Sequence, residues 1–253
     1  MSTSVVNVGH KVVSNGEWLA ARKALLAKEK ELTRMYDALS RERLELPWER
    51  VEKNYVFDGP KGKETLADLF GDKSQLMIQH FMFGPEWAEG CPSCSLMADS
   101  MDGSLEHLAA RDISLAVVSR ATMPQIEAFQ KRMGWRFKWV SSNANDFNWD
   151  YHVSFTKEEM ERGRMFYNFA EKSFPSQEAP GVSAFYKDEG GEIFHTYSAF
   201  ERGVEMVLNT YSYMDMAPKG RNEEGLSFPM AWVRHHDKYD GAQVKDAACC
   251  AGE

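Results

Sequence analysis

The chain has 253 residues, of which 43% are hydrophobic and 27% are charged, and its formal net charge at pH 7 is −8. This length and composition suffice for one large globular domain with appendages. The acidic balance argues against nucleic acid as a partner, because contacts to phosphates need a basic surface. No apolar stretch approaches the roughly 18 residues that span a bilayer, and residues 1–16 lack the apolar core of a signal peptide. We therefore expect no membrane partner and a cytoplasmic location.

The first predicted element is a long helix that begins after Ser14 and runs for about 30 residues until Pro47 ends it. Ser14 and Glu17 have the spacing of a capping box. Large apolar residues recur at every seventh position, at Trp18, Leu25, Leu32 and Leu39. The resulting apolar stripe must be covered by the main domain or by a second copy of the chain. A homodimer through this helix is one of these two expectations, and the oligomeric state stays open.

After Pro47 the sequence predicts alternating strands and helices. Strands are predicted at residues 55–57, 75–83, 113–119 and 137–140, and helices at 65–68, 91–110, 122–134 and 156–171. Two further strands, at 182–186 and 192–197, flank a Gly-containing turn and indicate a hairpin, and a last helix follows up to about residue 214. This order predicts an α/β fold with a mixed central sheet.

The expected domain organisation has three parts. Residues 1–50 form an N-terminal helical extension and residues 51–216 form the main domain. Residues 217–253 are rich in Gly, Pro and charge, and we expect an irregular C-terminal extension with a partly disordered tail.

The four cysteines fall in two pairs, Cys91 with Cys94 and Cys249 with Cys250, which is too few for a disulfide scaffold in so long a chain. Cys91 and Cys94 form a Cys-x-x-Cys motif after a predicted buried strand, where Pro92 opens a helix. At a helix N-terminus the backbone N–H groups favour a thiolate, so we expect Cys91 to be the attacking thiol. Cys94, one turn further in and more buried, would then close a disulfide with it. This chemistry needs neither a bound cofactor nor a metal.

Two other groups of candidate residues are given ordinary interpretations. Cys249 and Cys250 could be a relay dithiol or metal ligands, but we expect two exposed thiols in a polar tail. The run from His235 to Asp237 is expected to be surface charge, because adjacent side chains on one strand point apart.

The segment from Trp87 to Cys94 resembles the active-site segment of thioredoxins, with Trp-Ala four residues before the first cysteine. Pro180, ahead of the predicted hairpin, stands where thioredoxins carry a cis-proline. The resemblance implies that Trp87 and Pro180 contact the substrate. It also implies that the Ala179–Pro180 peptide bond is cis and faces Cys91.

From residue 11 to residue 237 the chain is similar to an uncharacterised thioredoxin-like family, number 899 among domains of unknown function. The matching segments are Glu17–Lys23, Phe81–Pro85, Gly90–Cys94, Arg132–Trp135 and Phe194–Tyr197. The resemblance implies a thioredoxin-like three-layer fold and a dithiol–disulfide oxidoreductase, acting on a protein or small-molecule disulfide.

Three residues near the motif depart from the thioredoxin pattern. Pro85 occupies the position of a buried aspartate that accepts a proton in thioredoxins. Glu86 and Glu89 lie close to the motif, and nearby carboxylates disfavour a thiolate. We therefore expect a less acidic nucleophile than in strongly oxidising relatives.

Two alternative functions remain open. Residues 81–91 and 146–153 resemble peroxiredoxin segments, which favours a thiol peroxidase, but Ala88 stands where peroxiredoxins need a Thr or Ser. The other alternative is a thioredoxin-like binding protein whose cysteines do no chemistry. The sequence leaves open the substrate, the electron donor and the direction of electron flow.

Overall fold

The computed structural model describes residues 9–239 and divides the chain into two compact units, Met1–Pro47 and Trp48–Glu253. Cys249 and Cys250 lie outside the described residues, so their role stays a prediction.

The first unit contains helix α1 (Asn15–Leu44), whose limits match the prediction closely. Ser14 caps the helix: its hydroxyl accepts a hydrogen bond from the Glu17 N–H, and the Glu17 carboxylate accepts one from the Ser14 N–H. No residue of α1 is buried, and Trp18 and Leu32 of the apolar stripe are 55% and 66% exposed. What covers this stripe, a homodimer partner included, stays a prediction.

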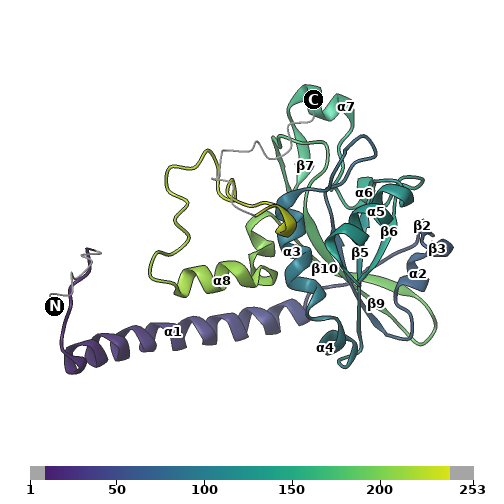
Figure 1. The fold of residues 1–253 in the computed structure, drawn as a ribbon. Helices are drawn as coiled ribbons and strands as arrows, with labels where there is room; N and C mark the ends of the chain where they lie inside the picture. Colours follow the sequence, from purple (N-terminus) through teal and green to yellow (C-terminus); the bar gives the residue numbers. More distant parts are fainter. Residues whose placement is uncertain (1–8, 240–253) are drawn as a thin grey trace. The chain divides into compact units, whose positions relative to one another are not determined.

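The second unit is built on an eight-stranded mixed sheet with the strand order β1-β10-β9-β4-β5-β6-β2-β3 (Figure 1). In chain order its strands are β1 (Glu49–Arg50), β2 (Val56–Gly59), β3 (Gly62–Thr65), β4 (Gln75–His80), β5 (Ile113–Ser119), β6 (Lys138–Ser141), β9 (Gly181–Lys187) and β10 (Ile193–Phe200). Strand β5 pairs in parallel with β4 and β6, whereas β9 runs antiparallel to both β4 and β10. Strands β7 (Met165–Tyr167) and β8 (Ala170–Lys172) form a separate hairpin.

Helices cover both faces of this sheet. They are α2 (Leu66–Leu69), α3 (Pro92–Asp102), α4 (Leu105–Ala109), α5 (Met123–Met133), α6 (Phe147–Asp150), α7 (Lys157–Arg162) and α8 (Asn209–Met216), with 3₁₀ helices η1 (Glu201–Val207) and η2 (His236–Lys238). Alternate residues of β5 separate the two cores: Leu115 and Val117 pack with α3 and α5, and Ala116 and Val118 pack with α2 and α6. No described helix combines the length and apolar character needed to cross a membrane.

This arrangement confirms the predicted fold class. Helix α3 follows β4, α5 follows the parallel neighbour β5, and the antiparallel hairpin β9–β10 completes a thioredoxin-like core. The predicted helix at 91–110 is interrupted after Asp102, where Gly103 separates α3 from α4. The predicted helix at 156–171 is wrong beyond residue 162, because Gly163 adopts φ 65° and ends α7 in a left-handed cap. The short hairpin β7–β8 follows instead.

Candidate functional site

Cys91 and Cys94 lie at the start of α3, at the carboxyl end of the central strand β4. Cys91 is the N-cap residue of α3 and Pro92 occupies the first turn. The first turn contains no acidic residue, so no side chain of the helix itself opposes a thiolate at this end. Both cysteines are buried, Cys91 at 3% and Cys94 at 1% exposed, and neither is in a disulfide. We expected Cys94 to be clearly more buried than Cys91, but their exposed fractions differ little.

Backbone hydrogen bonds fix both cysteines against the residues that follow β4. The Cys91 N–H donates to the Met82 carbonyl at 3.0 Å, and the Met82 N–H donates to the Cys94 Sγ at 3.5 Å. The buried Gln79 side chain donates to the Cys94 carbonyl at 2.9 Å. An N–H that points at sulfur stabilises negative charge there, so the contact from Met82 suits a thiolate on Cys94.

A close approach of aromatic rings holds the loop before Cys91. A Cβ at Gly90 would lie 2.5 Å from Phe81 Cε1 and 2.9 Å from Phe129 Cε1, so no larger residue fits without movement. Phe81 and Phe129 belong to the core cluster that also contains both cysteines. Packing against these two rings therefore favours glycine at position 90, directly before Cys91.

The two sulfur-bearing residues share the wall of one cavity, of about 770 Å³, here called the cysteine cavity. Its apolar wall combines Met82 and Met97 from either side of the motif with residues distant in sequence, among them Phe174, Leu208, Phe228 and Pro229. Three carboxylates at the cavity are each bound to other groups: Glu201 to Lys172, Glu205 to Arg221, and Glu223 to the Tyr211 hydroxyl and the Trp232 indole. The cavity therefore presents a mainly apolar surface to anything that reaches the cysteines.

Pro180 also lines the cysteine cavity, but the predicted cis peptide bond before it is wrong. The residues that the structure describes contain no cis peptide bond. The Pro180 carbonyl accepts a hydrogen bond from the Tyr167 hydroxyl at 2.7 Å, which ties this loop to strand β7. Trp87 is half-buried against the same core but is not among the residues that line the cavity. That either residue contacts substrate stays a prediction.

The C-terminal segment packs directly against the loop before Cys91, which the sequence did not indicate. His235 is buried, and its Nε2 lies 2.8 Å from the Gly90 carbonyl. The interpretation of His235 as surface charge is therefore wrong. Burial lowers the pKa of His235, and its Nδ1 lies 3.2 Å from the Arg132 guanidinium and 3.1 Å from the Glu89 carboxylate. Its place in the sequence, far from the motif and between polar residues, gave no signal of this contact.

The C-terminal segment also neutralises the negative charge of Glu89, through Lys238. Partial burial alone would raise its pKa, but the ion pair with Lys238 and the charge of Arg132 outweigh this and leave the pKa of Glu89 below its usual value. The Glu89–Lys238 contact measures 2.7 Å and Glu89–Arg132 measures 3.2 Å. The expected opposition of Glu89 to a thiolate is thereby reduced.

A buried ion pair supports the Pro180 loop. Glu178 is 1% exposed and lies 2.8 Å from the Arg120 guanidinium, which extends from the end of β5. Ser154 donates a further hydrogen bond to Glu178 at 2.6 Å. Burial raises the pKa of Glu178 despite these partners.

In the described part of the chain, no cluster of three or more His, Cys, Asp or Glu side chains is arranged to hold a metal ion.

The sheet order, with the helix α3 that carries the paired cysteines following β4, defines a protein with a thioredoxin-like fold. The chain belongs to the DUF899 family, described as bacterial proteins of unknown function, whose family model matches residues 7–239. No match was found among curated proteins.

Several solved structures are similar to the chain. One is a cysteine-to-serine mutant of PrxQ from Xylella fastidiosa, with 14% identity over 66% of this chain and 94% of that chain, at a TM-score of 0.43. Another is peroxidoxin BcpB from Mycobacterium tuberculosis, with 10% identity over 64% and 94%, at 0.43. A third is a putative thiol:disulfide interchange protein DsbE from Chlorobium tepidum, with 14% identity over 65% and 94%, at 0.38.

Proposed function

We propose that the chain is a thiol–disulfide oxidoreductase that uses Cys91 and Cys94. The observation that carries this proposal is the position of the pair: Cys91 caps α3, Cys94 follows within the first turn, and both line one cavity. The positive end of the helix favours a thiolate at Cys91. The fold class and the family are consistent with this chemistry.

The proposed reaction transfers two electrons from the protein to its substrate. The Cys91 thiolate attacks one sulfur of the substrate disulfide, the substrate S–S bond breaks, and the leaving sulfur takes up a proton. The Cys94 sulfur then attacks Cys91 in the mixed disulfide, which releases the substrate as a dithiol and leaves a Cys91–Cys94 disulfide. A separate dithiol reductant must return the pair to its reduced state, and the same steps reversed would oxidise a dithiol substrate.

The burial of Cys91 restricts the substrate. With Cys91 only 3% exposed, we infer that the disulfide enters the cysteine cavity as a small molecule or as an extended segment of a peptide or protein. The mainly apolar wall favours apolar groups beside that disulfide.

A thiol peroxidase is the second candidate, because a buried Cys91 is more accessible to a peroxide than to a bulky disulfide. Ala88 counts against it, since its methyl group cannot donate a hydrogen bond to a peroxide. If the Cys91–Cys94 pair shows no defined redox midpoint, the non-catalytic binding protein is favoured instead.

One set of measurements distinguishes these functions. In a Cys249→Ser/Cys250→Ser background, which removes the tail thiols, equilibration with glutathione should give a Cys91–Cys94 disulfide with a defined midpoint. Cys94→Ser should then accumulate mixed disulfides, and Cys91→Ser should not. Ser93→Ala, which keeps both thiols, is the matched control. Rapid hydrogen peroxide consumption with slow disulfide reduction would support the peroxidase, and a pair that neither oxidises reversibly nor reacts with peroxide would support the binding protein.

A further inference from the structure

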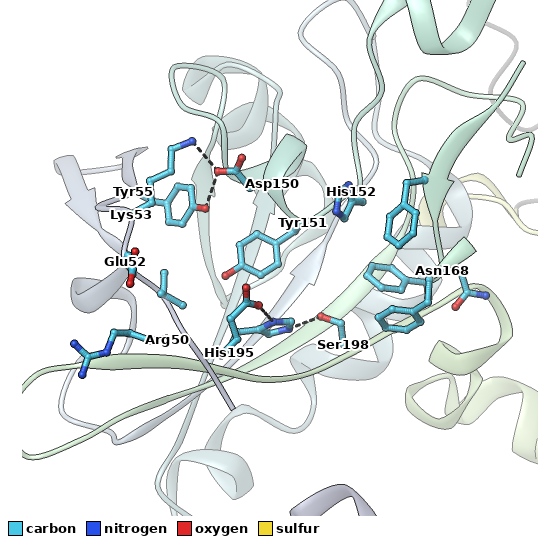
Figure 2. A pocket seen from close by; sticks show the side chains of 15 residues that line it. Arg50, Glu52, Lys53, Tyr55, Asp150, Tyr151, His152, Asn168, His195 and Ser198 are labelled. Carbon is cyan, nitrogen blue, oxygen red and sulfur yellow. Dashed lines mark hydrogen bonds and ion pairs between the residues drawn. The ribbon is translucent and has the colours of Figure 1, made fainter. Parts of the chain in front are cut away.

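A second pocket of about 730 Å³ lies in the same unit, and it shares no lining residue with the cysteine cavity. Strands β1, β7 and β10 and the end of α6 form its wall (Figure 2). We call it the aromatic pocket. Its residues take no part in the proposed disulfide exchange.

One end of the aromatic pocket is formed by aromatic rings that are unusually accessible. Phe169 is 67% exposed and Phe166 is 43% exposed. The Phe169 ring lies 5.5 Å from the ring of Phe200, and the Phe166 ring lies 4.8 Å from that of His152. Such an exposed set of ring faces suits an aromatic or cationic group of a ligand.

The backbone at this aromatic end is held in an unfavourable conformation. His152, Asn168 and Phe169 have φ values of 54°, 50° and 62°, in the left-handed region that residues other than glycine rarely adopt. Asn168 and Phe169 are the two loop residues of the hairpin β7–β8, and a two-residue hairpin turn of this kind needs positive φ at both positions. The turn therefore fixes where the Phe169 ring lies at the edge of the pocket.

The positive charges at the opposite end are already neutralised. Figure 2 shows Arg50 and Lys53 on the side away from Asn168. Arg50 pairs with Glu192 at 2.6 Å, outside the pocket lining. Lys53 is held 2.7 Å from Asp150 and also contacts Asp146. Each cation therefore already has a carboxylate partner, which weakens its attraction for a bound anion.

Two carboxylates of the pocket lining lack such neutralisation. Glu52 makes no ion pair with any described residue. Glu49, whose side chain is 80% exposed, pairs among them with the His195 ring alone, at 3.4 Å, so its carboxylate lies beside His195. These two side chains give the pocket lining an excess of negative charge.

The floor between the two ends is a rigid polar network. His195 Nε2 lies 2.7 Å from the Ser198 Oγ, Ser198 lies 2.7 Å from Ser183, and Ser183 lies 2.7 Å from the Nε2 of His80. A register irregularity in β10 between His195 and Tyr197 accompanies this arrangement, and such irregularities re-aim side chains. The buried network holds His195 and Ser198 in fixed positions at the pocket surface.

We propose that the aromatic pocket binds a small organic cation that carries an aromatic ring, such as an arylalkylamine. Its ring packs against Phe166 and Phe169, and its ammonium group faces Glu49 and Glu52. His195 and Ser198 line the floor of the pocket beside Glu49. An anion of the same shape is repelled by the two carboxylates and finds no unpaired cation in the lining, so it binds more weakly.

A pair of probes that differ in charge tests this proposal by isothermal titration calorimetry at pH 7.5. The wild-type chain should bind 2-phenylethylamine at least tenfold more tightly than 3-phenylpropionate. The double variant Glu49→Gln/Glu52→Gln should bind the amine about tenfold more weakly, which corresponds to about 1.4 kcal/mol. Glu127→Gln, an exposed carboxylate on α5, is the control and should bind as the wild type does.

The ring end is tested separately with Phe169→Ala. Because this side chain is largely exposed, the variant should keep its circular dichroism spectrum while it loses about fivefold in affinity for the amine. Equal affinity for the two probes would overturn the proposal, and so would amine binding that neither variant weakens.

Discussion

Gly90→Ala is the substitution that most directly tests how packing positions the cysteines. The added Cβ would lie 2.5 Å from Phe81 and 2.9 Å from Phe129, whereas carbon atoms in ordinary contact are about 3.5 Å apart or more. The shortfall is therefore about 1 Å against the nearer ring.

Neither ring can move aside without cost. Phe81 is 1% and Phe129 is 5% exposed, and the Phe81 ring lies 4.7 Å from that of Trp139. Overpacking a core of this kind costs about 1–3 kcal/mol, and two buried rings place Gly90→Ala near the upper value. For a unit of this size, about 3 kcal/mol lowers the melting temperature by roughly 6–12 °C.

Calorimetry and urea unfolding of the reduced protein measure this change. Gly103→Ala is the matched control, because nothing lies within 4 Å of its Cβ position and its φ of −69° suits alanine. The control should unfold at or slightly above the wild-type midpoint, and Gly90→Ala should also exchange disulfides more slowly as the Cys91 loop shifts. If the two variants are equally stable, the proposed role of Gly90 in packing is wrong.

Three further substitutions test other parts of the structure. Burial lowers the pKa of His80 to about 3, below the value of about 6.5 in the unfolded chain, so its contribution to stability is present above pH 6.5 and is lost as pH falls. Between pH 7 and pH 5 the wild type should lose about 2 kcal/mol more of its urea unfolding free energy than His80→Gln does; equal losses would contradict the shift. Arg120→Met leaves the Glu178 carboxylate buried without its cation and should cost about 3–5 kcal/mol in thermal unfolding, which Arg120→Met/Glu178→Leu should largely restore. For the proposed homodimer through α1, sedimentation should find a dimer that Leu25→Glu/Leu32→Glu converts to a monomer; a wild-type monomer at the same concentration would refute the dimer.

The elements that the sequence predicted well are those whose signals are local. Ser14 and Glu17 lie three residues apart and make the capping contacts that begin α1. Gly134, predicted to stop a helix, adopts φ 68° at the C-cap of α5. Cys91 and Pro92 open α3 as their order in the chain predicts. In each case the residues that decide the structure are within one helical turn of each other.

The predictions that failed have different causes. The buried state of His235 results from the Gly90 carbonyl, which is 145 residues away in sequence, and a single sequence carries no record of such a contact. The helix predicted at 156–171 ends instead at a local signal, Gly163, whose positive φ closes α7. The residues after it pair as the hairpin β7–β8 and Tyr167 packs in the core, so tertiary packing outweighs helix propensity there.

Local sequence signals identify the two cysteines, but they do not identify the residues that would select the substrate. The cysteines that would perform the reaction stand in a compact, readable motif on a strand–helix junction. The wall that would select the substrate comes instead from residues 173–175, 201–211 and 221–230, which include the segments with the least regular pattern. Loops and irregular segments placed on a rigid scaffold commonly determine binding, since they can vary without disturbing the core. Substitutions at Phe174 or Phe228 should therefore change which disulfides react while leaving the exchange chemistry of Cys91 and Cys94 intact.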